Sequence, residues 1–161
     1  GLVEQDPPLV GSLRVVHNVN AGLLGRWSTA RALISLVAPR GRDEVDRLLE
    51  GLDLAGVADR RTDELSGGER QRVAVARALR QQAALVLADE PVASLDPRTG
   101  DLVLGRLCDP TAERTVVVAL HDPALARRHA TRLVGLRAGR LVFDAGPSEI
   151  DERRLAALYA A

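Results

Sequence analysis

The sequence has no lysine, no methionine, one cysteine and no long apolar run. Its 22 basic residues are all arginine, so no lysine amine is available to bind a phosphate. The single Cys108 excludes a disulfide within the chain and is typical of a reducing compartment, although a small packing residue is the simpler interpretation. No apolar run approaches the roughly 20 residues that cross a bilayer, and the first residues have no signal-peptide layout. We therefore expect a soluble, cytoplasmic protein.

Composition and length are those of an ordinary globular domain. The 161 residues are 46% hydrophobic and 27% charged, and the 22 acidic residues balance the basic ones. This balance argues against nucleic acid or an anionic membrane as the main partner. No methionine stands at position 1, and residues 1–3 look like the end of a strand. These two features predict a fragment or a processed chain.

Two continuous apolar runs predict neighbouring strands of a parallel sheet. Residues 83–88 and 115–120 do not alternate with polar residues, which is typical of strands covered on both faces. Asp89-Glu90 follows the first run and His121-Asp122 follows the second. Because ligands in open α/β sheets bind at the carboxyl ends of the strands, these polar residues fall where a site is expected.

Three helices are predicted in the same part of the chain. Apolar residues recur at i, i+3, i+4 and i+7 between positions 45 and 52, which indicates a helix that Gly56 follows. A second helix covers about 68–82, with apolar residues inward and its arginines largely outward. A third covers 98–107 and is opened by Pro97 at a first-turn position.

The last thirty residues predict a hairpin and a closing helix. Residues 132–136 and 140–144 flank Arg137-Ala138-Gly139, which is typical of a hairpin turn that contains glycine. Residues 150–161 have the composition of a helix, and we find no internal repeat.

The strongest local signal is the segment Leu65-Ser66-Gly67-Gly68-Glu69, directly before the Arg-rich helix. Ser66 can cap that helix, while the two glycines let backbone N–H groups approach a ligand closely and the helix dipole adds positive potential. The segment therefore predicts an anion site. The alternative is a plain serine-capped helix start.

Residues 65–79, LSGGERQRVAVARAL, resemble the signature motif and its helix in the ATP-binding subunits of ABC transporters. Residues 87–91, LADEP, resemble the Walker B segment of the same family. The resemblance implies ATP and Mg²⁺ as cofactors. Asp89 would support Mg²⁺, usually through water, and Glu90 would polarise the attacking water as general base. The alternative for Glu90 is an acidic cap on a loop. The signature residues would contact the γ-phosphate of ATP bound to the opposite subunit, and they are Ser66, Gly67, Gly68 and Glu69.

Three further residues match the family in order. Asp96 belongs to a segment, Ser94-Leu95-Asp96, that is similar to the D-loop, which links the two ATP sites of a dimer. His121 resembles the H-loop histidine that contacts the γ-phosphate, although a lone histidine after an apolar run is more often structural. Gln5 resembles the Q-loop glutamine, which reaches Mg²⁺ and senses the membrane partner. Two other histidines, His17 and His129, have no motif around them and are interpreted as surface or packing residues.

A finer resemblance points to phosphonate-importer ATPases. Residues 18–29, NVNAGLLGRWST, and residues 135–140, GLRAGR, are similar to the corresponding parts of that subfamily. Trp27 is an expected anchor toward the permease, because aromatic residues are enriched at interfaces. A half-buried packing tryptophan is the alternative.

The decisive departure from the family is the missing phosphate-binding loop. No G-x-x-x-x-G-K-[ST] can occur without lysine. The resemblance therefore implies a partial P-loop NTPase fold of α/β class, N-terminally truncated, over residues 1–161. A helical subdomain would cover about 10–65, and residues 66–161 would hold the remaining motifs. We expect the isolated chain to be inactive, and its uncovered sheet to cause self-association.

The leading hypothesis is an ATP-hydrolysing subunit of an ABC importer of phosphonate type, peripheral on the inner face of the cell membrane. Its partners would be a second ATP-binding subunit, the permease subunits and a substrate-binding protein. One alternative is a non-catalytic fragment that completes a partner's ATP site. Others are a non-transport ABC ATPase acting on DNA or ribosomes, and an unrelated α/β domain.

Overall fold

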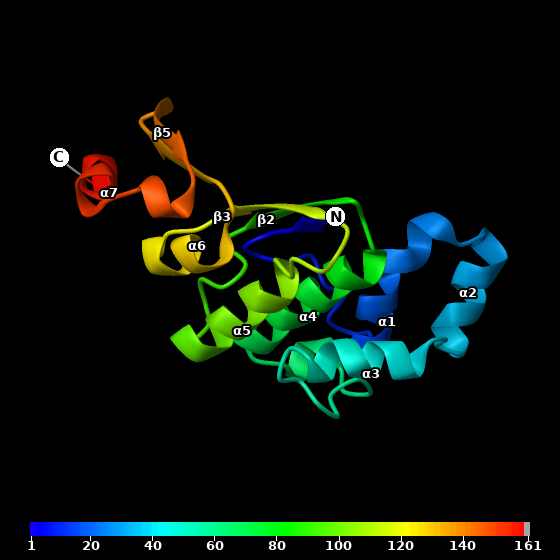
Figure 1. Cartoon of the computed structure of the whole chain (residues 1–161). Helices are drawn as coiled ribbons and strands as arrows, with labels where there is room; N and C mark the ends of the chain where they lie inside the picture. The colour runs from blue at the N-terminus through cyan, green and yellow to red at the C-terminus, as the bar shows by residue number, and fades with distance from the viewer. Residues whose placement is uncertain (160–161) are drawn as a thin grey trace. The chain divides into compact units, whose positions relative to one another are not determined.

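The computed structural model describes residues 1–159, except for the side chains at 152, 156 and 159. It divides into two compact units, residues 1–119 and the chain from Leu120 onward, and Figure 1 shows the elements of both. The first unit contains β1 (Leu2–Val3), α1 (Val15–Asn20), η1 (Ala21–Arg26), α2 (Thr29–Val37), α3 (Arg42–Glu50), η2 (Thr62–Glu64), α4 (Gly67–Gln81), β2 (Leu85–Asp89), α5 (Pro97–Leu107) and β3 (Thr115–Ala119). The second contains α6 (Pro123–His129), β4 (Leu133–Arg137), β5 (Arg140–Ala145), η3 (Pro147–Glu149) and α7 (Glu152–Tyr159).

The first unit is built on a three-stranded parallel sheet in the order β1-β2-β3. Leu2 lies opposite Leu87, and Leu87 lies opposite Val117. Side chains of β2 alternate between buried and exposed, so Val86 and Ala88 face the core while Leu85 and Leu87 do not. The prediction of a parallel α/β sheet is confirmed. The prediction that its strands are covered on both faces is wrong, because Leu85, Leu87 and Val117 on the second face are 49%, 46% and 55% exposed.

Helix α4 is the centre of the first unit. It packs against α1, α3, α5 and β1, and Figure 1 shows it between the strands and α3. Val73, Ala74, Val75 and Ala76 are completely buried, which requires neighbours on several sides of the helix. The expected helix at 68–82 is confirmed with a shift of one residue. The expectation that its arginines point largely outward is wrong, since the side chains of Arg72 and Arg80 are only 14% and 11% exposed.

Two other helices follow their predicted start and end signals to different degrees. Helix α5 begins at Pro97, as predicted, and Asp96 stands at its N-cap. Helix α3 ends at Glu50, before Gly51 rather than close to Gly56. Gly56 lies in the following loop. Its φ of 77° favours glycine there, so this residue is needed for the loop and does not end the helix.

The second unit contains the predicted hairpin. Strands β4 and β5 pair antiparallel, and the two residues between them, Ala138 and Gly139, have φ values of 48° and 73°. Two consecutive positive φ values are the geometry that matches the twist of a tight hairpin. The predicted closing helix is α7, and positions 160–161 of that prediction lie outside the described residues. No helix in the described part of the chain is long and apolar enough to cross a membrane.

Candidate functional site

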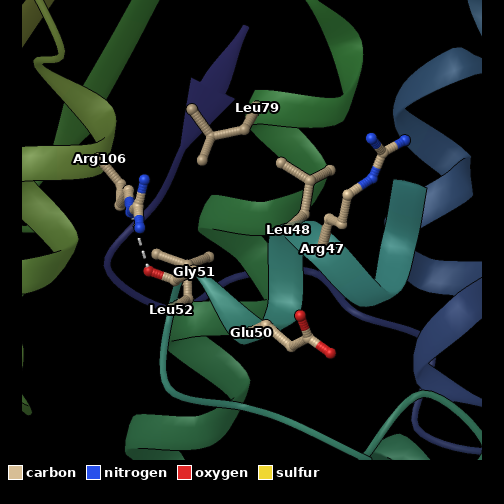
Figure 2. Close-up of a pocket in the computed structure, with 7 residues that line it drawn as sticks. All are labelled: Arg47, Leu48, Glu50, Gly51, Leu52, Leu79 and Arg106. Carbon is tan, nitrogen blue, oxygen red and sulfur yellow. Dashed lines mark hydrogen bonds between the residues drawn. The ribbon is translucent and has the colours of Figure 1, made fainter. Parts of the chain in front are cut away.

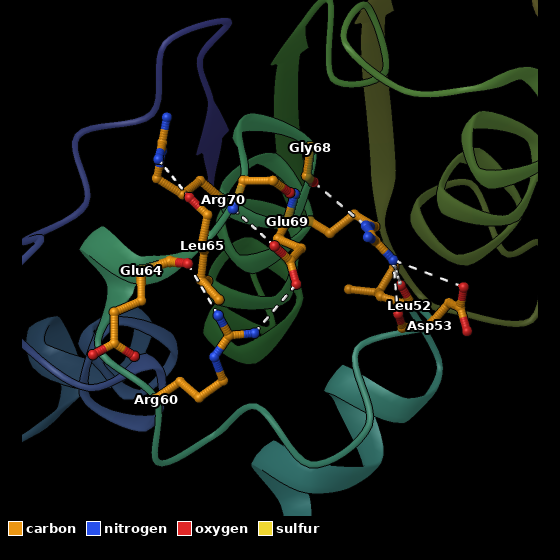
Figure 3. Close-up of polar contacts among 10 residues, drawn as sticks. Leu52, Asp53, Arg60, Glu64, Leu65, Gly68, Glu69 and Arg70 are labelled. Atoms are coloured by element: carbon orange, nitrogen blue, oxygen red, sulfur yellow. Dashed lines mark hydrogen bonds and ion pairs between the residues drawn. The ribbon is translucent and has the colours of Figure 1, made fainter.

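The start of α4 is a reciprocal capping box. The Ser66 hydroxyl accepts the backbone N–H of Glu69 at 3.3 Å, and a Glu69 carboxylate oxygen accepts the N–H of Ser66 at 2.7 Å. These bonds stabilise the ionised carboxylate and hold the pKa of Glu69 below its usual range. Arg60 Nη1 lies 3.6 Å from the other carboxylate oxygen, and a dashed line in Figure 3 marks this ion pair. The predicted cap is therefore confirmed, and Glu69 is fixed by backbone and guanidinium together.

The two glycines of this segment have different surroundings. A Cβ on Gly68 would lie 3.0 Å from the Leu95 side chain and 3.5 Å from the Ser94 carbonyl oxygen. The fold therefore favours glycine at 68 because the 94–96 turn approaches closely. Gly67 is exposed, and a Cβ there would meet nothing within 4 Å. The fold does not require glycine at 67, so the open backbone there is suited to a ligand, since first-turn N–H groups lack partners within the helix.

The carboxyl end of β2 brings a second pair of predicted residues together. Asp89 is the last residue of β2, is exposed and lies opposite Ala119 of β3. Glu90 follows with a φ of 46°, and its N–H donates to the Ala119 carbonyl at 3.1 Å. A left-handed φ in a non-glycine residue costs about 1–3 kcal/mol and is often found at functional sites. The Gln5 side-chain amide donates to the Glu90 carboxylate at 3.3 Å, although 85 positions separate the two residues.

Asp96 caps α5 beside the signature segment. One of its carboxylate oxygens accepts from the backbone N–H groups of Arg98 and Thr99, both at 3.1 Å. Hydrogen bonds from Thr99, together with that from Arg98, lower the pKa of Asp96. Because Leu95 touches Gly68, the 94–96 turn and the signature segment are neighbours within the first unit.

His121 is the one predicted site residue in the second unit. It stands two residues after the end of β3, its side chain is exposed, and the boundary between the units lies just before Leu120. The other eight lie in the first unit, and they are Gln5, Ser66, Gly67, Gly68, Glu69, Asp89, Glu90 and Asp96.

The residues at the end of β2 suit a magnesium ion whose ligands are mainly water and substrate phosphates. Within the described residues, no group of three or more His, Cys, Asp or Glu side chains could hold a metal. Mg²⁺ keeps several waters and often takes only one or two protein carboxylates together with substrate phosphates. Asp89 and the Gln5 oxygen fit that limited role, and a self-sufficient metal cage would not be expected here.

A pocket and Trp27 lie away from these motifs. The pocket has a volume of about 340 Å³, lies between α3, α4 and α5, and contains none of the predicted site residues (Figure 2). On its wall, Arg106 Nε donates to the Gly51 carbonyl at 3.2 Å. Trp27, before α2, is half-buried, with the Arg31 guanidinium 5.0 Å from its ring centre. Both interpretations of Trp27 therefore stay open.

A scan against protein families matches residues 1–93 to the family described as ABC transporter. This match covers more than half of the chain, which therefore belongs to the ABC transporter family. Two solved structures support the fold. One, an inward-facing, putative metal-chelate type ABC transporter, has a TM-score of 0.79 and 27% identity over 99% of this chain and 62% of that chain. The other, a dimeric ATP-binding cassette bound to ADP and Pi, has a TM-score of 0.73 and 28% identity over 91% and 62%.

Curated relatives carry the name of one subfamily. The phosphonates import ATP-binding protein PhnC 1 of Pseudomonas aeruginosa is 46% identical over 99% of this chain and 61% of its own length. The PhnC protein of Chromohalobacter salexigens is 43% identical over 100% of this chain and 60% of its own. The predicted family is confirmed, and the predicted similarity to phosphonate-importer ATPases is confirmed as a resemblance. The chain spans about three fifths of the length of the curated relatives that it matches.

Proposed function

We propose that the chain is part of the ATP-binding subunit of an ABC importer, and that the subunit hydrolyses ATP to drive uptake of a phosphonate or a related phosphorus oxyanion. The observation that carries the proposal is the start of α4. Its Ser66–Glu69 cap is complete, and the open backbone at Gly67 serves no packing need. Relatives named for phosphonate import, 43–46% identical, supply the substrate class.

In this proposal two groups of residues serve two ATP molecules. Ser66, Gly67, Gly68 and Glu69 bind the γ-phosphate of ATP held by a second ATP-binding subunit, and Asp96 connects the two sites. Glu90 accepts a proton from the water that attacks the chain's own ATP, and Gln5 orients the carboxylate and the ion. Asp89 supports Mg²⁺, which would neutralise charge on the phosphates. His121 contacts the γ-phosphate.

The same proposal assigns partners and a location. The subunit pairs with a second ATP-binding subunit and docks on permease subunits at the inner face of the cell membrane. A substrate-binding protein delivers the cargo from the other side. Specificity would lie in the permease and the binding protein, because a cassette fold supports many cargoes.

Residues 1–161 alone are proposed to bind ATP poorly. They contain no lysine and no Gly-rich phosphate loop, which in P-loop enzymes hold the β- and γ-phosphates. Calorimetry with Mg-ATP on this chain should give no heat of binding at micromolar nucleotide. A micromolar Kd would contradict this part of the proposal and leave the family assignment intact.

A chimera gives the direct test. Residues 1–161 replace the matching segment of the Pseudomonas aeruginosa relative, and ATPase activity and phosphonate uptake are measured with its permease. We expect both activities, with a loss of at least about 100-fold in kcat for Glu90→Gln, since general bases contribute that much or more. Glu64→Gln is the matched control, because this exposed glutamate belongs to no motif. A folded chimera without ATPase activity would overturn the proposal.

The complete Ser66–Glu69 cap also fits one second candidate, in which these residues complete a partner's ATP site without catalysis by this chain. Adding the isolated chain to a catalytic-base variant of the full relative, with ATP, separates the two candidates. Formation of a mixed dimer that Ser66→Ala weakens would support this candidate. No mixed dimer would exclude it.

A further inference from the structure

Two side chains of α4 hold the backbone of the segment that contains Gln5. Gln71 Nε2 donates to the Glu4 carbonyl at 3.3 Å, and Arg77 Nη1 donates to the Pro8 carbonyl at 3.1 Å. The two acceptors stand on either side of Gln5. Neither donor is among the predicted site residues, and each bond spans more than 60 positions of sequence.

The donors are set in the packed helix, whereas the acceptors lie in an exposed loop. Gln71 is 3% exposed and Arg77 is half-buried, so both have lost much of their rotamer freedom. Burial lowers the pKa of Arg77, and the negative charge of Glu4 opposes that effect. The pairing of the half-buried Arg77 guanidinium with this loop therefore has both a hydrogen bond and an electrostatic component.

The loop itself has few other means of holding its shape. Residues 4–6 are exposed, and the two prolines that follow carry no N–H. In this stretch the backbone N–H of Leu9 donates a hydrogen bond to the Pro7 carbonyl at 2.7 Å. Carbonyls at positions 4 and 8 are thus fixed by α4 rather than by a regular backbone ladder.

A continuous series of contacts then connects the two ends of the proposed site. Helix α4 begins at the Ser66–Glu69 cap, and its Gln71 and Arg77 hold the loop. Gln5 of that loop contacts Glu90 at the end of β2. Both anchors of the Gln5 loop therefore come from one helix.

We propose that Gln71 and Arg77 are positioning residues, which clamp the Gln5 loop to α4 and so hold Gln5 in contact with Glu90. The catalytic part of this inference rests on the proposed function, whereas the clamp itself is a property of the chain without nucleotide. Two separate experiments address the two parts.

The first experiment measures loop mobility without nucleotide. A nitroxide label is placed on the exposed residue 6 by Asp6→Cys in a Cys108→Ser background, and the spectrum reports motion on the nanosecond scale. We expect a shift to narrower lines in Arg77→Leu and in Gln71→Glu, which removes the amide donor at constant shape. Arg77→Lys keeps a cationic donor and should restore most of the broad spectrum.

Arg80→Leu is the matched control. Arg80 lies on the same helix, is 11% exposed, and pairs with Asn20 and Glu44 instead of the loop. Its replacement should leave the spectrum unchanged. Unchanged spectra in Arg77→Leu and Gln71→Glu, or equal narrowing in Arg80→Leu, would overturn the clamp.

The second experiment measures catalysis in the chimera. Arg77→Leu should lower kcat about 10- to 100-fold, the usual cost of misplacing a reacting group, with KM for ATP changed less than about twofold. Arg77→Lys should recover most of that loss, and Arg80→Leu should lose little. Equal losses in all three variants, or an effect on KM alone, would overturn the positioning role. A parent chimera without activity would count against the proposed function alone, and the spectra would still decide the clamp.

Discussion

Helix α4 and strand β2 are both rich in apolar residues, yet α4 is buried by neighbours in the first unit whereas one face of β2 stays about half exposed. Completely buried residues of α4 succeed one another from Val73 to Ala76. On β2, by contrast, Leu85 and Leu87 are 49% and 46% exposed. The difference shows that hydrophobic composition determines what could be buried, whereas the elements present in the chain determine what is buried.

The largest expected effect comes from making the same substitution in α4 and on the exposed face of the sheet. Val75→Ala in α4 removes completely buried methyl groups and should lower the free energy of unfolding by about 2 kcal/mol. Val117→Ala on β3 changes a side chain that is 55% exposed and should cost less than about 1 kcal/mol. Urea denaturation of both variants measures the two values. Equal losses would mean that the open sheet face is covered in solution.

The open face of the sheet should also govern association. Leu2, Leu87 and Val117 are neighbours across the three strands and are all 46–55% exposed. Apolar patches of this kind promote association, so we expect the wild-type chain to sediment as a mixture of monomer and larger species. Leu87→Gln should raise the monomer fraction with little change in melting temperature. Leu136→Gln, on β4 in the second unit, is the control, and it should leave the monomer fraction unchanged. A fully monomeric wild-type chain would contradict the prediction.

The sequence was sufficient for the strands at the motifs, for α3, α4 and α5, for the hairpin and for the local geometry of the motifs, whereas α6 was not predicted. Local chemistry predicted Ser66 as a helix cap, Pro97 in a first helical turn and Gly139 in a hairpin turn. Each residue stands where it was expected. The assignment of residues 10–65 to a helical subdomain, and the roles of the site residues, stay predictions.

Long-range polar contacts could not be predicted in the same way. Whether the arginines of α4 face solvent depends on loops far away in sequence. Asn18 was missed for the same reason. Its amide donates to the Val10 carbonyl at 3.0 Å and to Thr62 Oγ1 at 2.9 Å, and no local pattern indicates either partner.

A third, smaller effect separates the two glycines at the start of α4. Gly68→Ala places a methyl group 3.0 Å from the Leu95 side chain and should cost about 1 kcal/mol if that side chain adjusts. Gly67→Ala adds a methyl group with no neighbour within 4 Å, so the melting temperature should be unchanged or slightly higher. In the chimera, however, Gly67→Ala should reduce ATPase activity. Normal activity in that variant would indicate that the segment is only a capped helix start.

The smallest expected effect concerns the charge of Glu69. Its pKa is lower in the folded chain than in the unfolded one, so its contribution is complete above the ordinary glutamate range, near pH 4.3, and is lost as pH falls through the folded value. Glu69→Gln should therefore lower the free energy of unfolding at pH 7 by about 0.3–1 kcal/mol. The difference from wild type should disappear in acid. A difference independent of pH would exclude the carboxylate charge as its cause.

Three of the four arginines of α4 donate to main-chain carbonyls: Arg70 to Leu65, Arg72 to Leu52 and Asp53, and Arg77 to Pro8. Every amino acid offers the same carbonyl oxygen. Substitutions at the accepting positions can therefore keep these bonds, provided that the backbone path is unchanged, whereas substitutions of the arginines cannot. The loops around α4 should accordingly tolerate sequence drift, and in a saturation-mutagenesis screen intolerance should concentrate on the donor side of each contact.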